Sequence, residues 1–264
     1  MANRKPVNRR NSQKTLDRLR EVWRLACVWI KSLSSEGIDD LHVCISKGNH
    51  KIGNCLNVSI MPVVTCGKMG ELCCVICYAV RCFCQMGIKG NKWKKNKWLI
   101  NTLLAVFYPE KYFGEIKSAI SDGVSRKRNP IRFFRWHVGG EILSLGYFKW
   151  MCFIAEEFPN VRFLAFTKRY ELVNEYMDKN GGRNCIPENL SVIYSAAPGQ
   201  SVPNPYHLPE CHIFMADETL NKVWRVEFVE SKIYNCPSNC ETCQCNGAGC
   251  WFIKDGCIIL IIQH

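Results

Sequence analysis

The sequence predicts an α/β fold: a partial (β/α) TIM-like barrel of parallel strands followed by a cysteine-rich, metal-binding C-terminal segment. Two observations predict it. Short β-branched or aromatic runs alternate with segments of helical periodicity, which is the pattern of a parallel sheet built from βαβ units. In addition, most of the 18 cysteines among the 264 residues fall into two groups. A hydrophobic content of 47% is enough for a packed core.

The helical segments follow a polar, basic tail over residues 1–13. From residue 15 to residue 32 apolar side chains recur at the spacing of one helix face. The helix expected at 110–121 begins beside Pro109, and the helix expected at 170–179 ends before Asn180-Gly181-Gly182. The other expected helices cover residues 73–85, 97–107 and 145–157.

Five apolar runs are expected to form strands, at residues 54–64, 130–138, 161–166, 190–195 and 212–216. In parallel α/β folds the functional residues lie at the carboxyl ends of the strands. The first strand is followed by the cysteines of residues 66–77, and the second by Gly139-Gly140-Glu141. We therefore expect these two segments to share one edge of the sheet. The resulting division is a basic tail and amphipathic helix (1–45), the barrel domain (46–230) and the cysteine-rich segment (231–264).

Charge and cysteine usage indicate the compartment and the partner. The N-terminus has no apolar signal region, and no run reaches the roughly 18 apolar residues that span a bilayer, so we expect a cytoplasmic protein without a membrane partner. In that reducing compartment clustered cysteines more often hold metal than form disulfides. The net charge of +12 suits a nucleic-acid or nucleotide substrate, although a solvated basic surface would also explain it.

The first cysteine group has the spacing C-x6-C-x3-C, formed by Cys66, Cys73 and Cys77, with Cys74 able to replace Cys73. Three thiolates leave one coordination position open, as an iron–sulfur centre that binds a small molecule requires. Two alternatives remain: a closed zinc site completed by Cys74, Cys82 or Cys84, or buried cysteines without metal.

The second cysteine group offers four ligands, Cys236, Cys240, Cys243 and Cys250, which suffice for a closed tetrathiolate site. It lies in a polar, glycine-rich segment. We expect an auxiliary iron–sulfur cluster or structural zinc there, with Cys245 as a competing ligand.

The Gly139-Gly140-Glu141 turn has two interpretations. Paired glycines allow a ligand to approach the backbone, and the carboxylate can then pair with an ammonium group. Alternatively, the turn simply joins a strand to a helix, and Glu141 favours the helix dipole.

Three side chains near the expected strand ends are candidates for catalysis: His137, Arg135 and Lys168. We expect His137 and Arg135 to alternate onto one face beside the glycines. A buried structural histidine and a structural ion pair are the alternatives for these two residues. Lys168 would contact an anionic substrate, or Thr167-Lys168-Arg169 would only cap the next helix.

Several motifs after residue 45 resemble the phage gene product 88 domain family. They are Ser46-Lys-Gly-Asn-His-Lys-Ile-Gly53, Asn57-Val-Ser59, Thr65-Cys66 to Cys77-Tyr78-Ala79, Phe134-Arg-Trp-His137, Ala165-Phe-Thr-Lys168, Cys236-Pro237, Cys240, Cys243 and Cys250-Trp251. This resemblance implies a shared architecture and a phage or mobile-element origin.

The chain more loosely resembles the radical S-adenosylmethionine enzymes, although their usual spacing is C-x3-C-x2-C. That resemblance implies a [4Fe-4S] cluster on Cys66, Cys73 and Cys77, S-adenosylmethionine as cofactor, and an electron donor as partner. It also implies cofactor contacts from Gly139, Gly140, Glu141 and Ser195. The leading hypothesis is therefore an iron–sulfur enzyme of this kind. The alternative is a non-catalytic, zinc-stabilised nucleic-acid-binding protein of a phage or plasmid.

Overall fold

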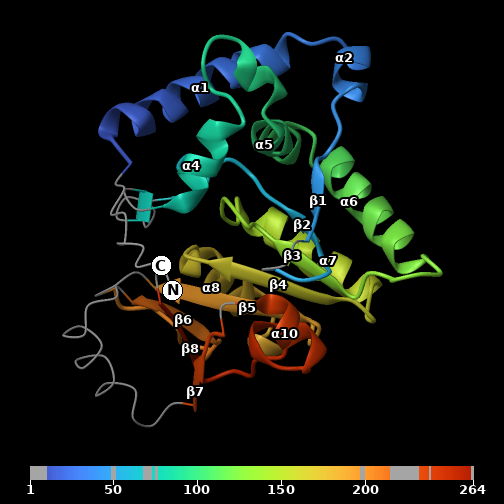
Figure 1. Cartoon of the computed structure of the whole chain (residues 1–264), viewed down its shortest axis with the longest axis vertical. Helices are drawn as coiled ribbons and strands as arrows, with labels where there is room; N and C mark the ends of the chain where they lie inside the picture. The colour runs from blue at the N-terminus through green and yellow to red at the C-terminus, as the bar shows by residue number, and fades with distance from the viewer. Residues whose placement is uncertain are drawn as a thin grey trace, which may run out of the picture.

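A computed structural model describes residues 11–48, 52–67, 73–74, 77–196, 200–214, 232–237 and 239–262. Its centre is an eight-stranded sheet of order β1-β2-β3-β4-β5-β6-β8-β7 (Figure 1). Only the pairing of β1 with β2 is antiparallel. The strands are β1 (Ile45–Lys47), β2 (Leu56–Val58), β3 (Phe133–Trp136), β4 (Arg162–Thr167), β5 (Leu190–Ala196), β6 (Glu210–Phe214), β7 (Lys232–Asn235) and β8 (Cys257–Ile262).

Strands β2 to β6 are neighbours in chain order, so this part of the sheet is wound in one direction. The two ends of the strand order, β1 and β7, are not paired with each other in the described part of the chain. The α/β class and the mostly parallel sheet are thus confirmed. The closed or nearly closed barrel is not, because the described sheet is open.

The helices begin where a side chain can accept hydrogen bonds from the first free backbone N–H groups. Ser12, Asn96 and Ser144 supply such caps to α1, α5 and α7. The helices are α1 (Gln13–Lys31), α2 (Ser35–Asp39), α4 (Tyr78–Gln85), α5 (Lys97–Phe107), α6 (Pro109–Val124), α7 (Leu145–Glu157), α8 (Tyr170–Lys179) and α10 (Cys240–Cys245), with short 3-10 turns η1 (Lys92–Lys95), η2 (Arg183–Cys185) and η3 (Gly249–Trp251). No helix in these described ranges is long and apolar enough to cross a membrane.

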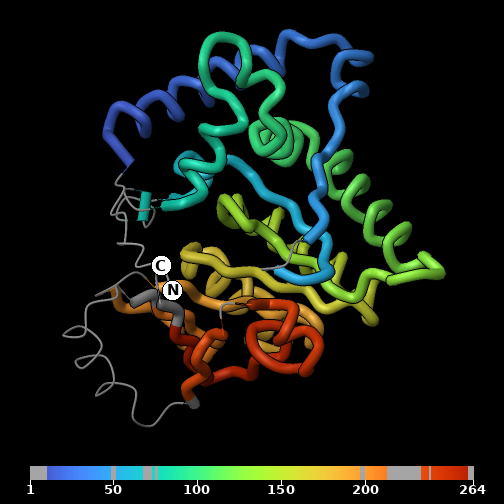
Figure 2. Tube along the Cα trace, viewed as in Figure 1, coloured from blue at the N-terminus to red at the C-terminus, as the bar shows by residue number. Residues whose placement is uncertain are grey.

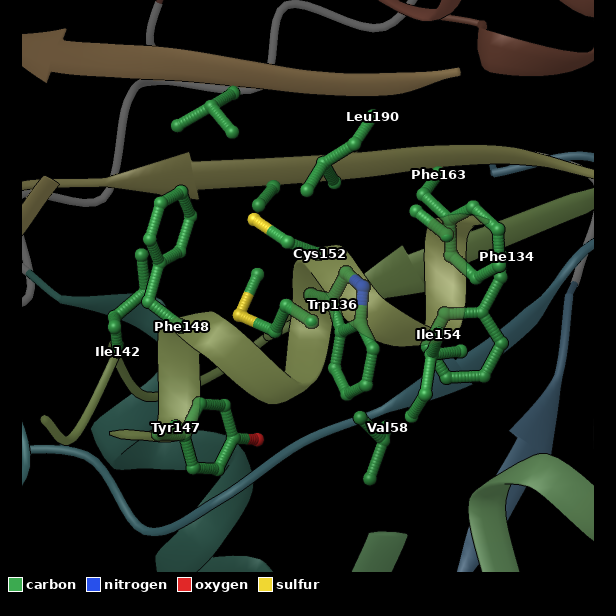
Figure 3. Packing of buried hydrophobic residues seen from close by; sticks show 14 of the residues in the cluster. Val58, Phe134, Trp136, Ile142, Tyr147, Phe148, Cys152, Ile154, Phe163 and Leu190 are labelled. Carbon is green, nitrogen blue, oxygen red and sulfur yellow. The ribbon is translucent and has the colours of Figure 1, made fainter. Parts of the chain in front are cut away.

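One face of the sheet, which we call the helix face, packs against α6, α7 and α8. Figure 3 shows Phe148, Cys152 and Ile154 of α7 beside Trp136 and Phe163 of the strands. All five side chains are at most 2% exposed. Burial of an apolar side chain of this size contributes about 1.5–3 kcal/mol, so this layer stabilises the fold.

The other face, which we call the C-terminal face, is covered by the segment that carries α10 and η3, coloured red in Figure 2. Trp251 is 1% exposed and packs edge-on against Phe133 at 5.0 Å between ring centroids. Leu164, Ile193 and Ile259 complete this layer. The C-terminal segment also supplies two strands, β7 and β8, of the same sheet.

A third apolar cluster joins α1 to α4, α5 and the first cysteine group. Trp29 of α1 meets Trp93 of η1 edge-on at 5.7 Å between ring centroids. In Figure 1, α1 and α5 lie at one end of the molecule, beyond β2. The N-terminal helix is therefore part of the core beside the cysteines.

The expected helices at 97–107, 145–157 and 170–179 are confirmed with the same bounds. The first strand is shorter than expected: β2 ends at Val58, and the backbone turns at Val63 (φ 75°), still within the predicted range. The expected residues 215–216 of the last strand lie outside the described residues.

Candidate functional site at the carboxyl edge of the sheet

Residues that follow β3 and β4 meet a residue near the end of β5 at one edge of the sheet. The Thr167 hydroxyl donates to Glu141 Oε2 at 2.8 Å, and the Lys168 backbone N–H donates to the same oxygen at 3.1 Å. The Lys168 ammonium donates to Ser195 Oγ at 3.1 Å. The structure thus brings Glu141, Lys168 and Ser195 together at this edge.

Glu141 is a buried carboxyl group held by protein donors. Burial raises its pKa, while the Lys168 ammonium and the Thr167 hydrogen bond oppose that rise. Carboxylates that receive several hydrogen bonds retain their charge more easily in a low-dielectric site. Glu141 therefore ties the ends of β3 and β4 together, whether or not it also faces a ligand.

The first cysteine group consists of two hydrogen-bonded thiol pairs. Cys66 pairs with Cys74, and Cys73 pairs with Cys77. The Val63 backbone N–H also donates to Cys66 Sγ at 3.3 Å. All three predicted ligands thus lie in one region, and Cys74 belongs to it as well.

The four thiols differ in acidity. The hydrogen bond from Cys73 lowers the pKa of Cys77 to about 7, aided by the backbone N–H groups of Val80 and Ala79 in the first turn of α4. The hydrogen bond to Cys77 and burial raise the pKa of Cys73. A thiol at a helix N-terminus is a typical source of thiolate near neutral pH.

Lys168 lies near this thiol group, directly after β4. Burial lowers its pKa, but the nearby Cys73 and Glu141 outweigh that effect, so the net pKa is raised and the side chain stays an ammonium. It is 9% exposed. Lys168 therefore places a permanent positive charge beside sulfurs that would become negative as metal ligands.

The donor chemistry of this group fits a thiophilic metal or an iron–sulfur cluster, because four sulfurs, one with a lowered pKa, lie next to a buried cation. Within the described ranges, no three or more His, Cys, Asp or Glu side chains are placed so that they could hold a metal ion. The assignment of Cys66, Cys73 and Cys77 as ligands therefore remains a prediction.

The two glycines of the turn are explained by packing. A Cβ on Gly139 would lie 2.4 Å from the Trp98 ring, and a Cβ on Gly140, whose φ is +93°, would lie 2.9 Å from the Ile60 carbonyl oxygen. The Gly139 N–H donates to Ser59 Oγ at 3.1 Å. The glycines thus let the chain after β3 run close to the chain after β2, and cofactor contact is not needed to explain them.

The expectation that His137 shares a face with Arg135 is wrong. The backbone of His137 has φ 51°, which breaks the alternation of the strand directly after Trp136. Its Nε2 therefore lies 2.9 Å from the Tyr147 hydroxyl on the helix face. Burial lowers the pKa of His137 to about 3, so the imidazole is neutral at physiological pH. His137 is therefore a buried structural histidine, the alternative to a catalytic role.

Arg135 lies on the C-terminal face, since its strand neighbours Phe134 and Trp136 belong to the helix-face core. Its guanidinium lies 5.3 Å from the centre of the Phe166 ring. The residue is thus separated from His137 by the sheet and cannot act with it on one group.

Three residues make contacts at the site that are not expected from the sequence. Asn11 Nδ2 donates to the carbonyl oxygens of Cys74 (2.7 Å) and Cys77 (3.0 Å). Arg169 donates to the Ile142 carbonyl at 3.0 Å, and the Tyr78 hydroxyl donates to the Val138 carbonyl. Asn11 falls in the basic tail of the sequence, and only its position just before a helix cap could have drawn attention to it.

The second cysteine group lies on the C-terminal face. Cys243 and Cys250 are buried there, and Cys236 packs against them. Cys245, the expected competitor, is exposed. Two cysteines from elsewhere in the sequence, Cys55 and Cys211, join the same cluster.

The profile of the gene product 88 family matches residues 42–256, which is most of the chain and includes both cysteine groups. The chain belongs to the gene product 88 family. No curated protein and no solved structure matches it significantly.

Proposed function

We propose that this gene product 88 protein is an iron–sulfur enzyme resembling the radical S-adenosylmethionine enzymes, encoded by a phage or mobile element. One observation carries the proposal. Cys66, Cys73 and Cys77 lie beside the Glu141–Lys168–Ser195 contacts at the carboxyl edge of consecutive parallel strands. That is the edge at which α/β enzymes bind cofactors.

In this proposal Cys66, Cys73 and Cys77 hold a [4Fe-4S] cluster, and Cys74 is the neighbouring thiol that stays outside it. When bound, the cluster would supply an electron to the sulfonium group of S-adenosylmethionine. An external electron donor would be a partner. The raised pKa of Lys168, which Cys73 and Glu141 produce against the effect of burial, keeps a positive charge beside the thiolates.

The chain's own polar groups match the methionine and ribose parts of S-adenosylmethionine. Glu141 offers a carboxylate to the methionine ammonium group, and Lys168 offers an ammonium to the methionine carboxylate. Ser195, which already accepts from Lys168 Nζ at 3.1 Å, would contact the ribose. Thr167 holds Glu141 in place through its 2.8 Å hydrogen bond.

The second candidate is a zinc-stabilised protein that binds nucleic acid without catalysis. The basic segment of residues 72–109 favours it. Residues 72–109 contain six Lys or Arg residues and no Asp or Glu. Lys94 lies over both Trp29 and Trp93, at 5.7 Å from each ring centre, so this basic segment packs against the basic helix α1. Clustered cations of this kind attract a polyanion.

The test is anaerobic reconstitution with iron and sulfide, followed by reduction with dithionite and an assay for 5′-deoxyadenosine from S-adenosylmethionine. Wild-type protein should release it, and Cys66→Ser should not. Cys82→Ser, on the neighbouring helix α4, is the matched control and should retain release. A colourless protein that binds zinc, releases no 5′-deoxyadenosine and binds DNA in a salt-dependent way would establish the second candidate instead.

A further inference from the structure

Arg135 is a cation with an unsatisfied donor. It projects from the C-terminal face of β3, between Asn57 of β2 and Leu164 of β4. Its Nε is buried and has no hydrogen-bond partner in the described part of the chain. None of the salt bridges between described residues includes it. Arg135 as a whole is half-buried. A guanidinium stays charged in proteins, so its buried, unpaired Nε favours negative charge nearby.

Thiols lie on the same face as Arg135. The Phe166 ring, 5.3 Å from the guanidinium, packs against the cluster that contains Cys55, Cys211, Cys243 and Cys250. Protonated thiols are neutral and do not balance a guanidinium. Thiolates bound to a metal ion do so, because four thiolates around a divalent cation carry a net charge of −2.

We propose that Cys236, Cys240, Cys243 and Cys250 form a second centre that binds Zn²⁺, and that Arg135 is its counter-cation. The four cysteines have the spacing C-x3-C-x2-C-x6-C. Cys236, Cys243 and Cys250 lie in one layer, and Cys240 begins α10, the helix that carries Cys243. The proposal uses thiols that the candidate active site does not use, so its test is independent of the proposed function.

Local contacts support this choice of ligands. The Tyr234 hydroxyl lies 3.2 Å from Cys243 Sγ. At Gly249 (φ +67°) an added Cβ would lie 2.7 Å from the same sulfur, so the turn before Cys250 passes directly over Cys243. The Cys236 backbone N–H donates to the Leu260 carbonyl at 3.0 Å, which anchors the first ligand to β8.

The two remaining thiols of the layer come from the sheet itself. Cys55 precedes β2, and Cys211 lies in β6, so they form the floor beneath the C-terminal segment. The sulfurs of the described chain are not arranged around one point. In this proposal, zinc binding moves the four ligands of the C-terminal segment closer together, while Cys55 and Cys211 stay in place on the sheet. Such coupling between binding and folding is usual for structural zinc.

The test is zinc titration of the full chain under anaerobic conditions, in competition with a chromophoric chelator. Cys243→Ser and Cys250→Ser should each remove one high-affinity zinc per chain, whereas Cys27→Ser, on α1, should leave the stoichiometry unchanged. Arg135→Gln should weaken that site about 10- to 100-fold, the range found when groups around a metal site are changed. Arg135→Lys should recover most of the affinity.

A packing role for Arg135 is tested by Phe166→Leu, which removes the ring under the guanidinium and leaves the charge. That variant should keep wild-type zinc affinity. Equal zinc affinity in wild type and Arg135→Gln, both with native circular dichroism, would overturn the role of Arg135. Zinc stoichiometry unaffected by Cys243→Ser and Cys250→Ser, or iron in place of zinc at these residues, would overturn the site.

Discussion

His137 shows how one backbone angle places a side chain on the opposite face of a sheet. Strict alternation along residues 130–138 predicts that it shares a face with Arg135. The left-handed backbone at His137 instead turns its ring toward Tyr147, which in turn contacts Tyr112. Periodicity could not reveal this, because the conformation depends on the packing of α6 and α7 rather than on the strand's own sequence.

The neutral, buried His137 should make stability depend on pH. Its pKa in the folded chain is lowered to about 3 from 6.5, so its contribution is complete above pH 6.5 and decreases as the pH falls toward 3. The loss is up to about 1.4 kcal/mol per pH unit, because the unfolded chain binds a proton that the folded chain does not.

Urea unfolding of His137→Gln between pH 6.5 and pH 4.5 should therefore show a shallower loss of unfolding free energy than wild type. His42→Gln, a change at an exposed histidine, is the control and should keep the wild-type slope. An NMR titration that places the His137 imidazole near its ordinary pKa would contradict this account.

At the scale of elements, helices could be predicted from the sequence where apolar side chains recur regularly along one face. The helices at 97–107, 145–157 and 170–179 have the expected bounds because their apolar positions repeat with helical spacing and their ends carry caps or glycines. Strands β1, β7 and β8 were not predicted. Strand β1 has only three residues, and β7 has only four. Strand β8 lies near the end of the sequence and pairs with β6 across a long separation.

The turn between β3 and α7 should be intolerant of side chains for reasons of packing. Gly139→Ala places a Cβ against the Trp98 ring, and overpacking of this kind costs about 1–3 kcal/mol of unfolding free energy. Gly114→Ala, in α6 with nothing within 4 Å of its added Cβ, should instead stabilise by about 0.5–1 kcal/mol. Unfolding midpoints of the two variants are the measurement. Wild-type stability in Gly139→Ala would contradict the packing explanation.

The start of α1 should hold the first cysteine group in place. Asn11→Ala removes two hydrogen bonds, to the carbonyl oxygens of Cys74 and Cys77, and should cost about 1–3 kcal/mol locally. The thiols should then react faster with a maleimide reagent, as mass spectrometry of the Cys73–Cys77 region would show. Gln13→Ala, which removes only an exposed contact to Asp17, should not change the rate. Equal labelling rates in the two variants would contradict the proposed role of Asn11 in holding the cysteines.

At the scale of the whole molecule, a mostly parallel sheet places one thiol group at its carboxyl edge and another on its C-terminal face, with a cation beside each. Lys168 lies near Cys66 and Cys73, and Arg135 lies near Cys240 and Cys250. The sequence predicted both cysteine groups from their local spacing. It could not predict that Arg135, Cys55 and Cys211 accompany the second group, because those contacts depend on sheet order and on which face each strand residue occupies.

Iron and acid-labile sulfide per chain, measured after anaerobic reconstitution, test the central claim most directly. Wild type should hold a [4Fe-4S] cluster that is lost in Cys66→Ser, Cys73→Ser and Cys77→Ser and retained in Cys74→Ser and Cys84→Ser. Retention of full iron in all three ligand variants, or zinc alone in the wild-type protein, would contradict a cluster site at the carboxyl edge of the sheet.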